Sequence, residues 1–360
     1  MNIIKRFYHF FEKVTVPLGD VMCITAFIFL FNWANIWKWA AFLTISLITI
    51  VVAFILTIIE LMHGNRIKQN VAGESVIAQK LNEAMKVWYK NEQYGEVVTF
   101  GKALGRALYI SANYETRISI GELVKSAAEN LGDDLLLVDV LLDDLGWTKH
   151  LCGRKDAISD IESAIKIATE RNYYKEICKG YRHLMAIELS EWKDPQKAED
   201  LLNKAYDAYN CLEDGHEKDI LLSGLLFASS ELAFKQQKYD IAMKKAKESE
   251  KIRRELHELD RHMRYYAQVG KIEYFRPNGN IRTAKESFLK GIDESESVSR
   301  IDELVKNAYG YTICCFKLNE RKKAKRRCGE ILKKYGEIPL YSEDSILRNE
   351  YRKIINQGQK

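Results

Sequence analysis

Several groups in this 360-residue chain could carry out chemistry, but their spacing matches no known active-site motif. The sequence has no glycine-rich phosphate loop and no HExxH zinc motif. Its seven histidines and seven cysteines include no set at metal-ligand spacing, and no two cysteines form a CxxC pair. Buried free thiols of this kind are typical of a reducing compartment. The sequence therefore predicts a protein that is not an enzyme and that uses no cofactor and no metal.

Two carboxylates, Asp20 and Glu60, stand at the edges of the most apolar stretches. Seventeen uncharged residues separate Asp20 from Lys38, and twenty-one separate Lys38 from Glu60. Because about 20 apolar residues span a bilayer, the pattern predicts transmembrane helices over 14–32 and 39–60. The two carboxylates either belong to a proton or ion pathway or are solvated anchors at the interface, and we favour the second interpretation.

Flanking charge predicts the orientation of this two-helix anchor, which occupies residues 1–73. Lys and Arg residues precede and follow the hairpin, whereas its loop carries only Lys38. Because cytoplasmic flanks carry the excess of positive charge, both termini and the rest of the chain are expected in the cytoplasm, at the plasma (inner) membrane. Residues 1–14 are either an amphipathic helix on the inner leaflet or the first turns of the first spanning helix. The anchor would contact membrane lipid and offers a surface for homo-oligomers.

The strongest basic cluster lies near the C-terminus and consists of Arg321, Lys322, Lys323, Lys325, Arg326 and Arg327. It suits anionic lipid headgroups or an acidic partner, and a solvated helix face is the plainer interpretation. Beyond residue 73 the chain is close to neutral, because only six of the 55 Lys and Arg and three of the 50 Asp and Glu precede that point. No aromatic residues interleave with the cluster, so nucleic acid is not expected as a partner.

Helices must position these groups. Only four prolines occur, and long polar stretches repeat with helical periodicity, which predicts an all-α fold. A linking or capping helix is expected within 74–92, and a C-terminal capping helix (Ser342–Ile355) with its tail within 337–360. Between them, over 93–336, we expect six helix pairs: Tyr94–Asn113 with Glu115–Asn130, Asp133–His150 with Lys155–Arg171, Tyr173–Glu191 with Pro195–Asn210, Lys218–Gln236 with Tyr239–Arg254, Arg261–Arg276 with Ile281–Ser295, and Ile301–Lys317 with Arg321–Tyr335.

Small residues recur at a nearly constant interval in the second helices of these pairs. The recurring alanines are Ala157, Ala198, Ala242, Ala284 and Ala324. Seven residues after the first four stand Ala164, Ala205, Ser249 and Gly291. Small residues seven apart mark one helix face against which another helix packs closely. Self-similarity with a period of about 40 residues indicates an array of helical repeats.

Three segments carry a resemblance to a known family. Trp192–Ala198, Gln237–Ala242 and Gly279–Ala284 resemble the start of the second helix of tetratricopeptide repeats, with its turn residue and first alanine. The resemblance covers about residues 93–336 and is weakest for Tyr94–Asn130, where no alanine can be placed. The intervals here exceed the usual repeat of about 34 residues, which implies longer helices or connections. The family implies an α-solenoid whose first helices line a concave groove.

The same resemblance implies which side chains face the groove. Twelve residues before each alanine lie the small-residue positions of the first helices, at Leu145, Ala186, Ser230, Ile272 and Thr312. The groove-facing residues are then Asp139, His183, Phe227, Glu231, Tyr266, Glu273, Lys306 and Tyr309. Aromatic residues beside charges suit the capture of a peptide, and ordinary core or solvated positions are the alternative for each.

Two functions follow as hypotheses. The first is a membrane-anchored, tetratricopeptide-like scaffold or receptor that binds a protein or peptide partner in its concave groove. The second is a signal-sensing membrane effector of the defence or stress type, whose hairpin oligomerises and permeabilises the membrane. Asp20, Glu60 and the N-terminal segment motivate the second hypothesis, which otherwise rests on analogy of layout.

Overall fold

The computed structural model describes residues 71–357 except 192–193 and 258–261. These residues form helices and no strand, which confirms the all-α prediction for this part of the chain. Glu74–Lys360 is set apart as one compact unit. No helix in the described ranges is long and apolar enough to cross a membrane. The predicted hairpin with Asp20 and Glu60 lies outside the described residues.

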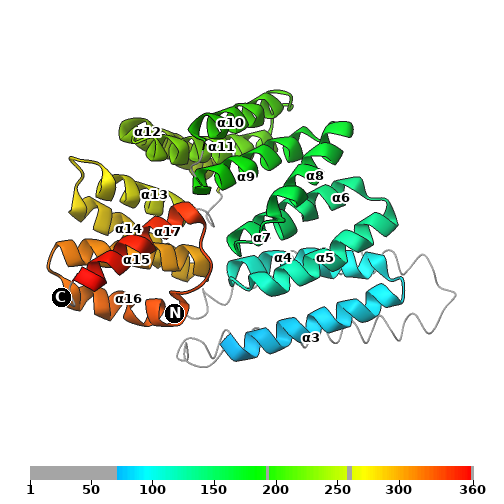
Figure 1. Cartoon of the computed structure of the whole chain (residues 1–360), viewed down its shortest axis with the longest axis horizontal. Helices are drawn as coiled ribbons and strands as arrows, with labels where there is room; N and C mark the ends of the chain where they lie inside the picture. Colours follow the sequence, from blue (N-terminus) through cyan, green and yellow to red (C-terminus); the bar gives the residue numbers. More distant parts are fainter. Residues whose placement is uncertain (1–70, 192–193, 258–261, 358–360) are drawn as a thin grey trace, which may run out of the picture. The chain divides into compact units, whose positions relative to one another are not determined.

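The helices follow one another in pairs (Figure 1). In chain order they are α3 (Val71–Lys90), α4 (Tyr94–Ile110), α5 (Tyr114–Leu131), α6 (Asp134–Asp139), η1 (Val140–Trp147), α7 (Thr148–Leu151), α8 (Ala157–Glu170), α9 (Tyr174–Glu191), α10 (Pro195–Asn210), α11 (His216–Lys235), α12 (Tyr239–Glu255), α13 (His262–Phe275), α14 (Ile281–Ser297), α15 (Ile301–Lys317), α16 (Arg321–Tyr335) and α17 (Ser342–Gln357).

The recurring alanines lie where first and second helices pack. All five are at most 2% exposed, and the predicted small positions of the first helices are buried too. The hydroxyl of Ser230 donates a hydrogen bond to the carbonyl oxygen of Ala242 at 2.7 Å, so these two positions, twelve residues apart, are in direct contact. Close approach of backbones is the physical reason for small residues at both sites.

The first pair follows the same register with different residues. A residue with positive φ ends the first helix of several pairs, at Ala112, Gln237 and Asn319, and Ala242 and Ala324 each follow five residues later. In the first pair that place is taken by Arg117, which is 8% exposed. Twelve residues before it stands Gly105. The missing alanine of the first pair is therefore an arginine.

A π-helix interrupts the first helix of the second pair. The predicted helix Asp133–His150 is continuous, but η1 forms its middle part. The hydroxyl of Thr148 donates to the carbonyl of Asp143, five residues earlier, at 3.0 Å. A π-helical stretch changes the direction of the side chains that it carries, and such stretches are frequent at functional sites. Here Asp143 contacts Lys179 of α9, and Asp144 contacts Arg117 of α5.

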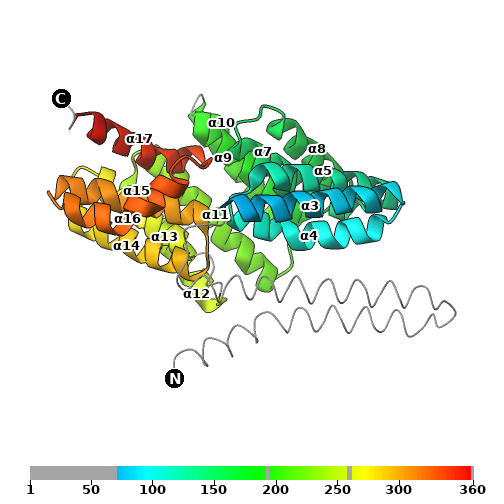
Figure 2. The same ribbon diagram turned by 90° about the horizontal axis from the view of Figure 1, so that it is seen from below.

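The C-terminal segment packs back onto the array. The predicted capping helix is α17, which packs against α15, with Leu347 fully buried and the rings of Tyr309 and Tyr351 5.2 Å apart (Figure 2). Just before it, Tyr341 reaches α9, where its hydroxyl donates to the carbonyl of Ala186 at 3.0 Å. A contact between residues 155 positions apart brings the end of the array to its early helices.

Candidate functional site

The inner side of the helix pairs encloses a cavity of about 400 Å³. Its walls come from α4, α5, α6, η1, α7, α9, α11, α13 and the start of α15, and Tyr341 also lines it. A volume of this order lies within the range of small-ligand sites. The lining combines aromatic rings with charged groups of both signs.

Four of the eight predicted groove residues meet in this cavity: Asp139, His183, Phe227 and Glu231. The other four do not line it. The Glu273 carboxylate accepts the backbone N–H of Asn280 at 3.0 Å and pairs with Arg276, so it holds the turn after α13. Lys306 is buried against Glu303.

The two remaining predicted groove residues are aromatic and have structural contacts. Tyr309 is buried under α17 and donates to the carbonyl of Gly336 at 2.9 Å. Tyr266 accepts from the guanidinium of Arg254 at 3.4 Å. The covering of α15 by α17 is thus what removes Tyr309 from the inner surface.

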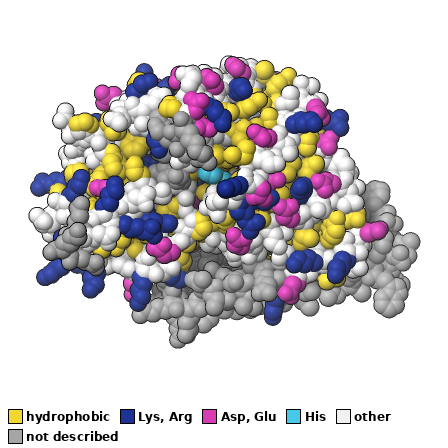
Figure 3. Space-filling model, in the orientation of Figure 1, with side chains coloured by type: hydrophobic (Ala, Val, Ile, Leu, Met, Phe, Trp, Pro, Cys, Tyr) yellow, Lys and Arg dark blue, Asp and Glu magenta, His cyan; other side chains and the backbone are white. Residues whose placement is uncertain are grey.

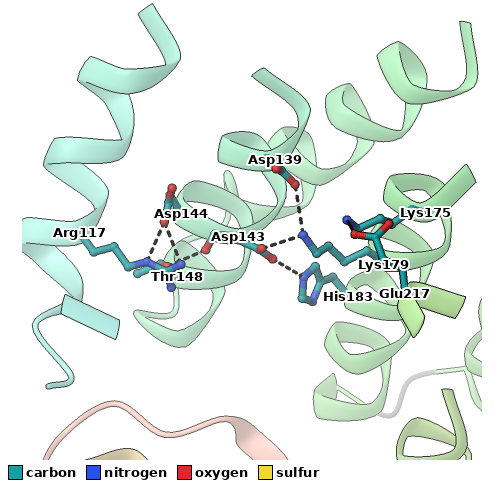
Figure 4. A network of polar contacts seen from close by, with 9 residues as sticks. All are labelled: Arg117, Asp139, Asp143, Asp144, Thr148, Lys175, Lys179, His183 and Glu217. Atoms are coloured by element: carbon teal, nitrogen blue, oxygen red, sulfur yellow. Dashed lines mark hydrogen bonds and ion pairs between the residues drawn. The ribbon is translucent and has the colours of Figure 1, made fainter. Parts of the chain in front are cut away.

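A network of polar contacts forms one wall of the cavity (Figure 4). The Asp143 carboxylate lies 2.8 Å from the Lys179 ammonium and 3.2 Å from His183 Nε2, and Asp144 lies 2.8 Å from the Arg117 guanidinium. Burial opposes the charge on Asp143, but Lys179 and His183 outweigh it and hold the pKa of Asp143 well below its usual range. The wall is therefore an ordered set of satisfied charges that link α5, η1 and α9.

His183 is an uncharged member of this wall. Its ring stacks on Trp147 with centroids 4.9 Å apart, and only 8% of the residue is exposed. Burial lowers the pKa of His183 to about 4, against the hydrogen bond with Asp143, which raises it. At neutral pH the ring is therefore neutral, and its Nε2–H donates to the Asp143 carboxylate.

Acid should destabilise the folded chain through His183. Unfolded histidine has a pKa of 6.5 and folded His183 of about 4, so between these pH values the unfolded state binds the extra proton. The free energy of unfolding therefore has its full value above pH 6.5. It decreases as the pH falls, by up to about 3 kcal/mol at pH 4. Asp143, whose pKa is lowered, adds a loss of the same sign below its usual range. Urea unfolding at pH 7, 5.5 and 4.5 measures this dependence.

The His183→Gln variant isolates the histidine contribution. It should flatten the decrease in unfolding free energy between pH 6.5 and 4, because no titrating ring is left in the wall. His216→Gln is the matched control, since His216 is exposed at the start of α11. An unchanged pH dependence in the His183 variant would show that the ring does not carry the effect.

Arg264 also lines the cavity, and its guanidinium group has few partners in the described part of the chain. The guanidinium of Arg264 lies over the Phe227 ring at 4.6 Å, and its Nε is 3.5 Å from the Glu303 carboxylate. No hydrogen bond by its Nη atoms occurs within the described part of the chain, and the side chain is 25% exposed. Glu303 is also 2.6 Å from the Lys306 ammonium. Arg264 therefore presents two donor groups to the cavity.

Tyr109 stands between two further guanidinium groups. Arg117 lies 4.8 Å and Arg300 5.2 Å from its ring centre, and its hydroxyl accepts from Trp147 Nε1 at 3.4 Å. Arg300 is bound to the Asp302 carboxylate through two hydrogen bonds of 3.0 and 3.2 Å. These two arginines are thus already matched by Asp144 and Asp302.

Four residues that line the cavity are not among those predicted from the sequence, namely Arg264, Tyr109, Trp147 and Tyr341. Arg182 lies four residues before the small position Ala186 of its helix, and Arg264 lies eight residues before the equivalent position, Ile272. The positions of the two arginines in their helices therefore differ by one helical turn. That spacing puts both arginines on the cavity-facing side of their helices and could have revealed Arg264. Tyr341 lies outside the repeats and carries no such register.

The six cysteines of the described residues are free thiols, four of them buried. No three His, Cys, Asp or Glu side chains in this part of the chain are arranged to hold a metal ion. Comparison of the chain with protein-family models and with curated proteins finds no match.

Proposed function

We propose that this protein is a membrane-anchored, tetratricopeptide-like receptor that binds a short acidic segment of a protein or peptide partner in its central cavity. The observation that carries the proposal is Arg264, whose Nη groups face the cavity without a hydrogen bond in the described residues. A carboxylate of a partner would pair with these groups in a two-point arrangement that arginine favours. The hairpin of residues 1–73 would hold the captured partner at the inner surface of the plasma membrane.

The surroundings of Arg264 support a peptide-like ligand. Phe227 offers aromatic surface beside the charge, and Trp147 lines the same cavity, which suits a residue with an apolar part next to its carboxylate. Asp139, whose carboxylate lies 3.3 Å from the Lys179 ammonium and is 37% exposed, lines the same cavity and suits a backbone N–H of the same segment. A cavity of about 400 Å³ accommodates a few residues rather than a long extended chain.

Photo-crosslinking in intact membranes tests the proposal. Lys102 lies exposed on α4 at the cavity, so a photoreactive benzoylphenylalanine there should form a discrete adduct with the partner. The same group at Ile241, which is 51% exposed on α12 and does not line the cavity, is the positional control. An identical set of adducts from both positions, or none from Lys102, would refute cavity binding.

Arg264→Gln should remove the adduct. Loss of a charged hydrogen-bond partner at a desolvated site costs about 2–5 kcal/mol, which is about 30-fold or more in affinity. Arg282→Gln, at an exposed arginine at the start of α14, is the matched control and should leave the adduct unchanged. Circular dichroism of both variants separates loss of binding from loss of folding.

A further inference from the structure

Helix α16 differs in charge from every equivalent helix of the array. It carries eight Lys or Arg residues against the single Glu330, a net charge of +7. The second helices of the preceding pairs, α5, α8, α10, α12 and α14, carry net charges of −1, −2, −1, +2 and −1, counted in the same way. All six helices share one structural role, so the role itself does not require this excess.

Part of this charge is neutralised by neighbouring carboxylates. Arg327 binds Asp293 and Glu296 of α14 at 2.7 and 2.8 Å, and Lys323 lies 3.0 Å from Glu320. The Arg327 pairs fix α16 to α14, and the Lys323 pair lies within the first turn of α16; together these pairs involve two of the eight cations.

Four other cations of α16 are exposed, namely Lys322, Lys325, Arg326 and Lys333. No ion pair or hydrogen bond is made by any of their side chains with the described residues. On α12, by contrast, Lys245, Lys251 and Arg254 each pair with a glutamate of the same helix. The four cations of α16 thus lack the local neutralisation that the comparable helix has.

The four cations form one stripe. At 100° per residue they fall within a sector of about 100°, and they extend over about 16 Å of the helix. Gly329 lies in the middle of this sector, so no side chain projects between them. Ala324 and Cys328, which are buried, lie on the other side of the helix. Figure 3 shows Lys and Arg side chains along the lower left edge of the molecule, where Figure 1 places α16.

We propose that this stripe docks the C-terminal end of the array on the anionic surface of the membrane. A stripe of cations around a glycine matches a layer of lipid phosphates, to which each nearby Lys or Arg contributes attraction. The inference rests on the membrane anchoring of residues 1–73 in the proposed function, because a tether makes a weak surface contact effectively intramolecular. It does not depend on the cavity or on its ligand.

Lipid is favoured over the other anionic partners by the shape of the stripe. Single-stranded nucleic acid is bound by aromatic platforms interleaved with cations, and the stripe contains none. An acidic protein would be recognised by a concave or apolar centre inside the charged rim, whereas Gly329 makes the centre of this face flat.

Lysine acetylation of the full chain in nanodiscs tests the docking. In phosphatidylcholine nanodiscs with about a third phosphatidylglycerol, Lys322, Lys325 and Lys333 should be acetylated about fivefold more slowly than in pure phosphatidylcholine. Lys244 and Lys247, exposed on α12, should react at equal rates in both lipids. At about 1 M salt the difference in acetylation rate between the two lipids should vanish, because the Debye length is then about 3 Å and the attraction to the phosphates is screened.

A pair of variants completes the test. Lys325→Glu/Arg326→Glu should remove the protection of Lys322 and Lys333, whereas Lys244→Glu/Lys247→Glu should leave it intact. Equal rates in both lipids for a chain that has entered the nanodiscs would overturn the docking alone. A chain that fails to enter nanodiscs would overturn the anchoring and the docking together. Equal slowing of acetylation at the α12 lysines would also overturn the docking.

Discussion

Replacing Phe288 by alanine is expected to lower the free energy of unfolding by about 3–5 kcal/mol. The Phe288 side chain of α14 is fully buried. Its ring lies against Gly270 of α13 and Gly310 of α15, so close that a Cβ atom at either glycine would overlap it. The ring therefore fills the junction of three helices, and its removal leaves a cavity that rigid helices close only in part.

Urea unfolding of the purified chain measures this effect, with Ile241→Ala as the control. Ile241 is 51% exposed on α12, so its truncation should change the unfolding free energy by less than about 0.5 kcal/mol. Gly310→Ala should also destabilise, since the new methyl group must displace the Phe288 ring. A Phe288→Ala variant as stable as the Ile241 control would show that the three helices do not depend on this ring.

The repeat register was predictable from sequence because it rests on local geometry. Two helices approach closely where small residues lie at the contact, and an alanine recurs at this position in the second helix of five of the six pairs. The contact between Ser230 and Ala242 agrees with the twelve-residue spacing that the alanines imply. The helix beginning at Pro195 was predictable for a similar reason, since the Asp194 side chain accepts the backbone N–H groups of Gln196 and Lys197.

The cavity was predictable only in part, because its composition depends on contacts between distant segments. The repeat register places His183 and Phe227 on the inner side, but whether an inner residue is open or covered depends on what packs over it. Tyr341 and α17 lie outside the repeat pattern, and they cover α15 and reach α9. Tyr309 is buried for this reason, although it occupies a repeat position that lines the cavity in other helix pairs.

The π-helix was not predictable from periodicity. Its residues Val140–Trp147 carry the same apolar pattern as an ordinary helix over two turns. Within it, Asp143 meets Lys179 of α9 and Asp144 meets Arg117 of α5. Arg117 was equally hidden, because it takes a position that is alanine in other pairs.

Lys306→Met is expected to destabilise the chain by about 3–5 kcal/mol, because it removes one member of a buried ion pair. Glu303 and Lys306 have side chains 3% and 4% exposed and lie 2.6 Å apart on α15. Without Lys306, the ion pair that remains to the Glu303 carboxylate among the described residues is the longer one with Arg264, at 3.5 Å. The Glu303→Gln/Lys306→Met double variant should recover part of the loss, since the buried unpaired carboxylate is then gone and Arg264, whose side chain is 25% exposed, keeps contact with solvent.

A cycle of urea unfolding on the wild type, both single variants and the double variant gives the coupling between the two residues. A double variant less stable than Lys306→Met would contradict the expected compensation. The same variants should also change ligand binding in the cavity, because Glu303 is shared between Lys306 and Arg264. In Lys306→Met the unpaired carboxylate should attract Arg264 more strongly and reduce its availability to an acidic ligand, so the Lys102 crosslink should weaken. In the double variant Arg264 is released from Glu303, and the crosslink should return to at least its original intensity.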